Sequence, residues 1–369
     1  VMDSEKAEMQ RFFAVIPAGG IGSRLWPMSR ANAPKFLHDL TGNGQTLLQD
    51  TWDRLQPLAA GRTMVVTGDV HARAVADQLP ELDLSNVILE PSPRDSTAAI
   101  ALAAAVLAQR EPGVIIGSFA ADHVISDAAA FHKTVEEAVK VAATGKIVTI
   151  GLKPTEASVA FGYIKKGKRL ATDTACEVLE FVEKPDIATA RRYVSSDDYL
   201  WNAGMFIAPA AKLLEILAKT QPTLHSGVIE LAKAWGTDER DKVMEKIWPT
   251  LTKIAIDYSV AEPAARDGDV AVVPGDFEWH DVGDFAAIAE LQSQGRKGHL
   301  AVLGSARVLS DSSSGILVSD TGRLVALIGL EDVIVVDTAD ALLVTSKEHA
   351  QKVKSLVDSL RESGHSELL

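Results

Sequence analysis

The sequence has 369 residues, of which 47% are hydrophobic, and this is enough to bury a large core. An intrinsically disordered chain is therefore excluded, and the length predicts two or three domains, or one large domain with an appendage. The net charge of -13, from 37 basic and 50 acidic residues, argues against duplex DNA or an anionic membrane as the main partner.

The expected location is the cytoplasm. No stretch approaches the roughly 20 apolar residues that cross a bilayer, and the charged segment 1–11 lacks the apolar run of a secretory signal. The single cysteine, Cys176, excludes an internal disulfide and a cysteine-based zinc site, and it suits a reducing compartment as a small core residue. We expect neither a nucleic acid nor a membrane as a partner.

Short β-rich runs alternate with longer helical stretches in the first half of the chain. Strands are expected at residues 12–16, 63–67, 114–119 and 146–150, and helices at 46–55, 70–79, 98–107 and 128–143. Asp95 and Ser96 are expected to cap the helix at 98–107. This alternation predicts an α/β fold with a Rossmann-like mixed, mostly parallel sheet sandwiched by helices.

The pattern becomes less regular beyond Gly151. A hairpin is expected at 163–168, a strand at 178–182, and helices at 187–194, 211–219, 227–234, 238–247 and 285–291. Short β-runs follow a polar, glycine-containing stretch at 292–299, and a helix is expected at 350–361. We therefore predict one domain over residues 1–293 and a small β-rich C-terminal domain over 299–369 that ends in a helix.

A glycine-rich loop, Pro-Ala-Gly-Gly-Ile-Gly-Ser-Arg at 17–24, directly follows the first strand. Glycines let backbone N–H groups approach a phosphate, although a purely structural turn would use them too. Leu25 stands where a dinucleotide fingerprint needs its third glycine, and no Gly-Lys-Ser/Thr is present for a Walker A loop. The cations Arg24, Arg30 and Lys35 follow, and three positive charges suit a triphosphate.

The string at 18–30, Ala-Gly-Gly-Ile-Gly-Ser-Arg-Leu-Trp-Pro-Met-Ser-Arg, together with Pro34 and Lys35, resembles the signature of sugar-1-phosphate nucleotidylyltransferases. Its ending is similar to that of the mannose-1-phosphate guanylyltransferase (GDP-mannose pyrophosphorylase) branch. Blocks at 90–94, 121–125, 181–185, 201–206, 256–260 and 279–283 agree in order and spacing. The resemblance covers residues 12–345 and implies that residues 1–293 form a nucleotidyltransferase domain.

Such an enzyme transfers GMP from GTP to alpha-D-mannose 1-phosphate, giving GDP-mannose and pyrophosphate, and it requires Mg²⁺. Because the second pKa of the sugar phosphate is about 6, its oxygen is already ionised and can attack the α-phosphorus in line, without a general base or a covalent intermediate. Catalysis then consists of alignment and charge neutralisation. The resemblance also implies a homodimer that the C-terminal domain helps to build.

By resemblance, five side chains act in catalysis, namely Arg24, Lys35, Asp122, Lys184 and Asp281. Asp122 and Asp281 are expected to bind magnesium, which takes few protein carboxylates and completes its shell with phosphates and water. The alternative is that each is a turn or cap aspartate. A transition-metal site involving the adjacent His123 and His280 is disfavoured, because oxygen ligands suit triphosphate chemistry.

The resemblance also implies binding residues for each substrate. Those for the nucleotide are Ala18, Gly19, Gly20, Gly22, Ser23, Arg24, Glu90, Ser96 and Asp122; those for the sugar phosphate are Gly162, Glu183, Lys184 and Asn202. From the chemistry of guanine, Glu90 is expected to accept the two donors on one edge of the base, a capping or surface role being the alternative, and Ser96 to add a contact from a helix N-terminus. Lys184 would hold the phosphate, and Glu183 the mannose hydroxyls. Asn202, in a small-residue loop, would donate and accept, and Gly162 would let the backbone approach the ring.

Two departures from the family pattern are visible. Asp95 replaces the family's usual asparagine and puts a carboxylate near the expected base pocket, where it can alter nucleotide preference. The segment Pro34-Lys35-Phe36-Leu37 is one residue shorter than the family's Pro-Lys-Gln-Phe, which leaves the surroundings of Lys35 open. Relatives that also isomerise mannose phosphates carry a further domain, so isomerase activity is not expected of these 369 residues.

Three alternatives remain beside this hypothesis. The same chemistry can act on another sugar 1-phosphate, such as that of a heptose or fucose, or with another nucleotide. The chain can instead be a catalytically silent regulatory subunit that senses GDP-mannose, which the retained charged residues disfavour. A redox enzyme on a Rossmann fold is disfavoured by the missing third glycine and by the lack of a clear acidic ribose partner.

Overall fold

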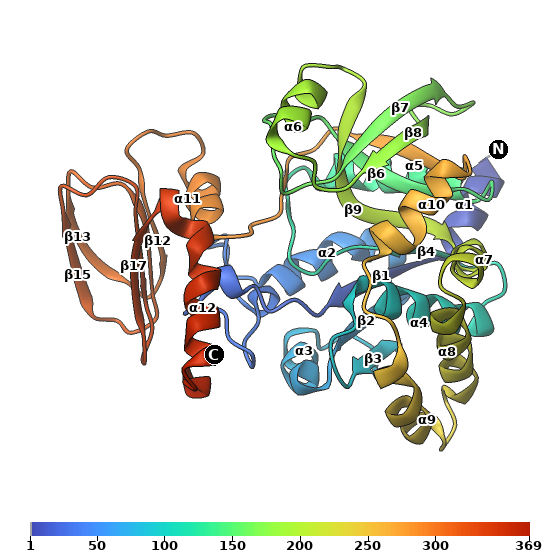
Figure 1. The fold of residues 1–369 in the computed structure, drawn as a ribbon, viewed down its shortest axis with the longest axis horizontal. Helices are drawn as coiled ribbons and strands as arrows, with labels where there is room; N and C mark the ends of the chain where they lie inside the picture. The colour runs from blue at the N-terminus through green and yellow to red at the C-terminus, as the bar shows by residue number, and fades with distance from the viewer. Residues whose placement is uncertain (1) are drawn as a thin grey trace.

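The computed structural model describes residues 2–369, and side chains from residue 6 onward. Its larger part is built on a nine-stranded sheet of order β3-β2-β1-β4-β9-β6-β10-β8-β7 (Figure 1). The strands are β1 (Phe12–Ala18), β2 (Thr63–Gly68), β3 (Val87–Glu90), β4 (Ile115–Ser118), β6 (Ile147–Leu152), β7 (Tyr163–Arg169), β8 (Cys176–Val182), β9 (Tyr199–Pro209) and β10 (Val270–Gly275). β8 and β9 run antiparallel to the strands they pair with, and the other pairs are parallel. The predicted mixed α/β sheet is confirmed.

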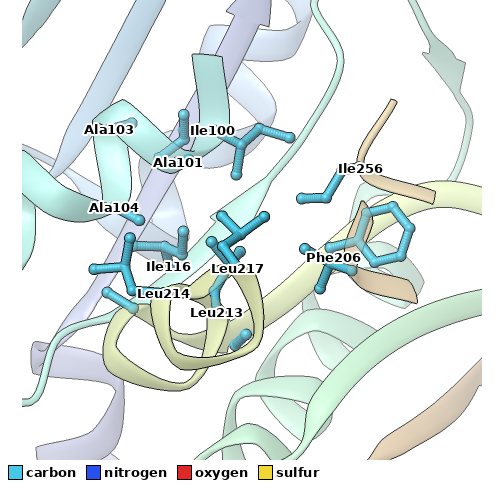
Figure 2. Packing of buried hydrophobic residues seen from close by; sticks show 14 of the residues in the cluster. Ile100, Ala101, Ala103, Ala104, Ile116, Phe206, Leu213, Leu214, Leu217 and Ile256 are labelled. Carbon is cyan, nitrogen blue, oxygen red and sulfur yellow. The ribbon is translucent and has the colours of Figure 1, made fainter. Parts of the chain in front are cut away.

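Helices cover both faces of this sheet. One face carries α4 (Asp95–Arg110), α7 (Ala210–Thr220) and α8 (Pro222–Ala234), with α9 (Arg240–Ile247) and α10 (Glu262–Arg266) beyond them. The other face carries α2 (Leu47–Ala59), α3 (Ala72–Gln78) and α5 (Ala128–Ala142), with α6 (Ile187–Val194) near β7 and the short α1 (Met2–Gln10) beside α5. Figure 2 shows why α4 is rich in alanine: Ala101 and Ala104 let it approach Leu214 and Leu217 of α7 closely.

Six strands lie where no strand was predicted. One of them, β9, crosses the centre of the sheet and includes residues 201–206. This segment resembled a loop in sequence because it contains Asn and Gly, which are depleted in strands. Gly204 has φ 71° and the pairing of β9 with β6 shifts register nearby, so the strand is irregular at this point. The other five are β3, β5 (Val124–Ile125), β10, β11 (Trp279–His280) and β12 (Leu300–Gly304).

The C-terminal part is β-rich, as predicted. β12, β14 (Gly315–Ser319) and β16 (Val333–Asp337) form one parallel sheet to which β17 (Leu342–Ser346) adds an antiparallel edge, and β13 (Arg307–Asp311) pairs in parallel with β15 (Leu324–Ile328). From β12 to β16, successive strands alternate between the two sheets, so the chain winds as a short β-helix. α11 (Phe285–Ser293) and α12 (Val353–Glu362) lie between this β-helix and the larger part (Figure 1).

The residues between α11 and β12 contain the predicted domain boundary. The two parts are not joined by this segment alone, because they share a hydrophobic core. Leu25, Trp26 and Val282 from the larger part pack there with Ile316 and Ile334 from the β-helix. Within residues 2–369, no helix is both long and apolar enough to cross a membrane.

Candidate active site

Asp122 and Asp281 lie on the same side of the molecule although 159 positions separate them in sequence. A two-stranded sheet explains this: β5 (Val124–Ile125), just after Asp122, pairs antiparallel with β11 (Trp279–His280), just before Asp281. The intervening His123 has its Nε2 3.7 Å from Oδ1 of Asp281. The two predicted metal ligands are thus brought together by backbone pairing.

Lys35 links these two segments. Its Nζ lies 3.1 Å from Oδ2 of Asp122 and donates a 2.6 Å hydrogen bond to the backbone oxygen of Asp281. The Lys35 side chain is only 5% exposed, so its ammonium group is shielded from water and has the Asp122 carboxylate as a partner. Burial alone would raise the pKa of the Asp122 carboxyl, but Lys35 and His123 outweigh burial and hold this pKa below its usual range.

The backbone after Asp281 is strained. Val282 has φ 52°, a conformation that is an outlier for a β-branched residue. Its side chain is buried in the core shared with the β-helix, and the packing there opposes relaxation of the backbone. The Asp281 carboxylate, 44% exposed, borders a cavity of about 960 Å³ that Phe161 and Trp201 also line.

Two oxygen donors are available for a divalent ion at this centre, from Asp122 and Asp281. Among residues 2–369, no three His, Cys, Asp or Glu side chains come together as a complete metal site. This donor set fits magnesium bound partly by substrate phosphates, since Mg²⁺ uses one or two carboxylates and keeps other positions for phosphate and water.

The glycine loop approaches Lys35 through Gly22. A Cβ on Gly22 would lie 2.7 Å from Cβ of Lys35, and its φ of 76° is one that side chains rarely adopt. Gly20, in contrast, has nothing within 4 Å of such a Cβ, so its backbone faces open space. Arg24 is exposed in the short 3-10 helix at Ser23–Leu25, and no ion pair to it is found within residues 2–369. The loop therefore presents bare backbone and a free cation beside the Lys35 centre.

Arg30 does not belong to this phosphate-facing set, contrary to the sequence interpretation. Its guanidinium forms a two-pronged pair with Asp340 of the C-terminal part, at 2.6 and 3.0 Å. Two of the three expected cations, Arg24 and Lys35, remain for a phosphate group.

Glu90 is buried at the end of β3, opposite the glycine loop. A Cβ on Gly19 would lie 3.5 Å from Oε2 of Glu90, which is ordinary van der Waals contact, so the carboxylate lies directly beside the loop. Burial raises the pKa of Glu90 to about 7. Its neighbours Asp95 and Ser96 do not cap α4 as predicted. Asp95, with φ 64°, accepts only from the N–H of Ser96, whose hydroxyl accepts the backbone N–H of Ile256 at 2.9 Å.

The four residues predicted to bind the sugar phosphate form one cluster. A Cβ on Gly162 would collide with Oε2 of Glu183, and the backbone oxygen of Gly162 accepts the N–H of Asn202 at 2.8 Å. Lys184 Nζ lies 3.5 Å from Oε1 of Glu183. Oε2 of Glu183 is buried, and no residue in the described part of the chain hydrogen-bonds to it, which is costly unless a ligand supplies a donor.

Asn202 differs from its predicted role in one respect. It lies in β9 and not in a loop, and its Oδ1 already accepts from Thr149 and from the N–H of Gly204. Its Nδ2 donates to Oδ1 of Asp257 at 2.9 Å. Because both lone pairs of Oδ1 are in use, only the second N–H of Asn202 remains for a ligand.

Asp257 is the functional candidate that the sequence analysis did not single out, although the block 256–260 contributed to the resemblance. It begins a π-helix at Asp257–Ala261, a feature frequent at functional sites. Burial raises the pKa of Asp257, against the effects of its hydrogen bonds and of Lys184. The same carboxylate acts on Glu183: burial and then Asp257 raise the pKa of Glu183 to about 7, and Lys184 opposes them. The Asp257 and Glu183 carboxyl groups thus influence one another, and Lys184 lowers the pKa of both.

Comparison with known proteins gives a consistent result. The nucleotidyl transferase family matches residues 13–298, and the family described as the MannoseP isomerase/GMP-like beta-helix domain matches residues 306–360. The xanthan biosynthesis protein XanB of Xanthomonas campestris is 38% identical over 97% of this chain and 75% of its own length. The mannose-1-phosphate guanylyltransferase of Escherichia coli is 35% identical over the same shares of the two chains.

A solved structure is similar over nearly the whole chain. The crystal structure described as mannose-1-phosphate geranyltransferase from Thermus thermophilus has a TM-score of 0.85 and 31% identity, and the match covers 95% of this chain and 99% of that one. The similarity therefore includes the β-helix as well as the larger part.

Proposed function

Since this chain belongs to the nucleotidyl transferase family, we propose that it transfers GMP from GTP to alpha-D-mannose 1-phosphate, giving GDP-mannose and pyrophosphate. The observation that carries the proposal is the meeting of Lys35, Asp122 and Asp281 at one point beside the glycine loop, whose Gly22 lies against Lys35. An in-line transfer needs such a centre, because attacking group, phosphorus and leaving group must all be aligned and their charge neutralised.

Each part of the chain has a distinct task in this reaction. The backbone of Gly19 and Gly20 would approach the triphosphate, with Ala18, Gly22 and Ser23 shaping the loop and Arg24 pairing with phosphate oxygens. Lys35 would neutralise charge at the reacting phosphorus, and Lys184 would hold the incoming sugar phosphate. Because that phosphate oxygen is already ionised near neutral pH, no side chain need remove a proton from it.

Asp122 and Asp281 would hold the magnesium ion, which when bound offsets the negative charge of the phosphates and orients them. Lys35, which lies beside Asp122, would add its positive charge to the same phosphates.

The two carboxylates Glu90 and Glu183 would select the substrates. Guanine offers two donors on one edge, and the Glu90 carboxylate, which lies beside Gly19 of the glycine loop, would accept both. Glu183, with its unpartnered oxygen, would accept from mannose hydroxyls, and Asp257 would do the same beside it. Ser96 stays a candidate for nucleotide contact as a donor, because its oxygen already accepts from Ile256.

We further propose that the chain forms a homodimer and is located in the cytoplasm. Leu309, Leu324 and Ile328, all more than half exposed, form an apolar stripe on β13 and β15, and a second copy of the chain would cover it in a homodimer. The cytoplasm is the expected location, since both substrates are highly charged and do not cross membranes unaided.

A panel of substrates tests the proposal. Pyrophosphate release is measured with GTP, ATP, UTP or dTTP, each against mannose, glucose and fucose 1-phosphates. We expect the GTP and mannose 1-phosphate pair to give the highest kcat/KM. Absence of activity with this pair but turnover of another pair would move the assignment to that sugar or nucleotide, and binding of GDP-mannose without any turnover would favour a regulatory subunit.

A further inference from the structure

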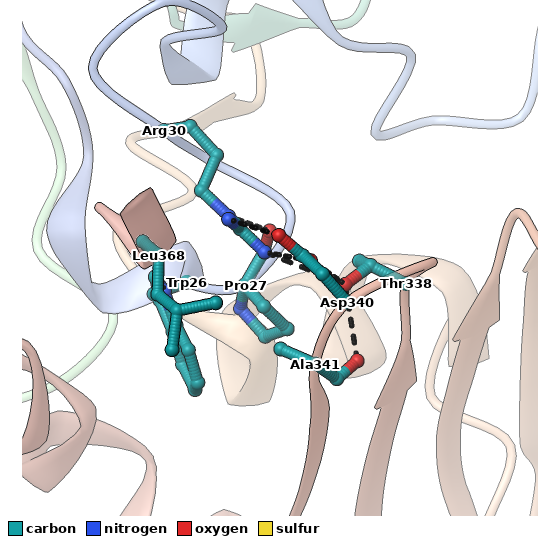
Figure 3. A network of polar contacts seen from close by, with 7 residues as sticks. All are labelled: Trp26, Pro27, Arg30, Thr338, Asp340, Ala341 and Leu368. Atoms are coloured by element: carbon teal, nitrogen blue, oxygen red, sulfur yellow. Dashed lines mark hydrogen bonds and ion pairs between the residues drawn. The ribbon is translucent and has the colours of Figure 1, made fainter. Parts of the chain in front are cut away.

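We propose that Asp340 of the β-helix is a positioning residue for the reaction, acting through Arg30 on the glycine loop; this rests on the proposed function. Figure 3 shows the contact: the two nitrogens of the Arg30 guanidinium meet the two oxygens of Asp340, at 2.6 and 3.0 Å. Thr338 adds a longer contact of 3.5 Å to Arg30 and donates to Asp340 at 3.1 Å. Paired, planar geometry of this kind fixes direction as well as distance.

Further contacts connect Arg30, and with it the ion pair, to the glycine loop. Its Nε donates to the backbone oxygen of Pro27 at 2.7 Å, and its guanidinium lies 5.8 Å from the ring centre of Trp26. Ser29, the residue before it, donates from its hydroxyl to the backbone oxygen of Gly22. Gly22 is the loop glycine that touches Lys35, so a few hydrogen bonds separate Asp340 from the catalytic centre.

Two other contacts tie the same centre to the C-terminal part. Trp26 Nε1 donates to the backbone oxygen of Leu368 at 2.6 Å. On the other side, Gln351 hydrogen-bonds to Asp284, which caps α11 only three residues after Asp281. The strained Val282 is packed into the core that the two parts share. The β-helix therefore braces both the Lys35 segment and the Asp281 segment.

The geometry favours a role in positioning over one in global stability. Asp340 is 48% exposed, and exposed ion pairs contribute little to folding. Arg30, in contrast, is only 13% exposed and is embedded in the loop. Loss of Asp340 should thus leave the fold intact while loosening the loop, and misplacement of reacting groups by a fraction of an ångström is enough to slow an aligned transfer.

The test compares Asp340→Ala with Asp358→Ala in the full chain. Asp358 is the matched control: it is also 48% exposed and also pairs with an arginine, but its partner Arg361 lies three residues away on the same helix, so this pair links no two segments. We expect Asp340→Ala to lower kcat/KM for GTP about fivefold without changing KM for mannose 1-phosphate, and Asp358→Ala to leave both unchanged.

A double-mutant cycle completes the test. If Asp340 acts through Arg30, the variant Arg30→Ala/Asp340→Ala will be no slower than Arg30→Ala alone. Unchanged kinetics for Asp340→Ala, or additive losses in the double variant, would overturn the proposal, whatever happens to the melting temperature. Hydrogen exchange of amides 19–35 provides a readout that needs no turnover: Asp340→Ala should speed it and Asp358→Ala should not. If the wild type fails to turn over GTP and mannose 1-phosphate, the proposed function fails, but this exchange result still decides whether Asp340 restrains the loop.

Discussion

Nζ of Lys35 lies 3.1 Å from Oδ2 of Asp122, and this pair occupies the point where a phosphate and a divalent ion would meet. Replacing Lys35 by Met keeps the length of the side chain and removes its charge. We expect kcat to fall about 100-fold, because stabilisation of transition-state charge is lost. Lys212→Met is the control, since Lys212 is also largely buried and pairs with Asp269 at 2.9 Å, outside the site. Equal kcat for the two variants would refute the role of Lys35.

Asp257→Asn tests the sugar side of the site. The new amide can still accept from Asn202, so the local structure should persist, but the charge that would accept mannose hydroxyls is gone. We expect KM for mannose 1-phosphate to rise about tenfold, the loss of one charge-assisted hydrogen bond, with KM for GTP unchanged. Exposed Asp267, beyond α10, supplies the control variant Asp267→Asn. A rise in KM for GTP alone would place Asp257 elsewhere in the reaction.

Gly20 and Gly22 should respond differently to alanine. In Gly22→Ala the new Cβ meets Lys35 in a left-handed backbone, so we expect a loss of stability of roughly 1–2 kcal/mol as well as of activity. In Gly20→Ala the new Cβ enters open space, and the free energy of unfolding should not change, while KM for GTP rises because the triphosphate needs that space. Urea unfolding and steady-state kinetics on both variants check this. Equal effects of the two substitutions on stability would contradict it.

We expect the buried Glu90 carboxyl group to make the folding stability of the protein depend on pH. Its pKa of about 7 in the fold exceeds the ordinary value of 4.5, so between these pH values the folded state binds more protons than the unfolded state. Stability therefore declines as pH rises from about 4.5 to 7, and the penalty is fully present above that range. Glu90→Gln removes this penalty. Its gain in unfolding free energy should be near zero at pH 4 and about 3 kcal/mol at pH 8. Denaturant unfolding at the two pH values measures it, and a gain that is the same at both would show that Glu90 is not buried in its neutral form.

Much of the larger part could be predicted from the sequence because its elements carry local signals. The apolar run of β1, the Thr46 cap of α2 and the alanine-rich α4 each follow from short-range patterns. β9 could not be predicted, since Asn202 and Gly204 disfavour a strand locally and only its pairing with β4 and β6 makes it one.

Site residues could be predicted where their type and sequence motif indicate their role. They could not be predicted where a contact with a residue distant in sequence decides that role. Lys35, Asp122 and Asp281 were expected together, and β5 and β11 bring them together. Arg30 resembles a phosphate ligand in sequence, but its guanidinium pairs with Asp340, which is 310 residues away. No local sequence pattern predicts such a contact. The same is true of Asp257, whose role in the site depends on its hydrogen bond with Asn202.

We expect Asp122 and Asp281 to share one divalent ion during GMP transfer. The most direct test is pyrophosphate release from GTP and mannose 1-phosphate over a magnesium titration, with wild type, Asp281→Asn and the neighbouring Asp276→Asn. We predict that the wild type depends on magnesium and on both substrates, that Asp281→Asn lowers kcat about 1,000-fold, and that Asp276→Asn behaves as wild type. An Asp281→Asn variant with the wild-type rate and the same magnesium dependence would contradict the account.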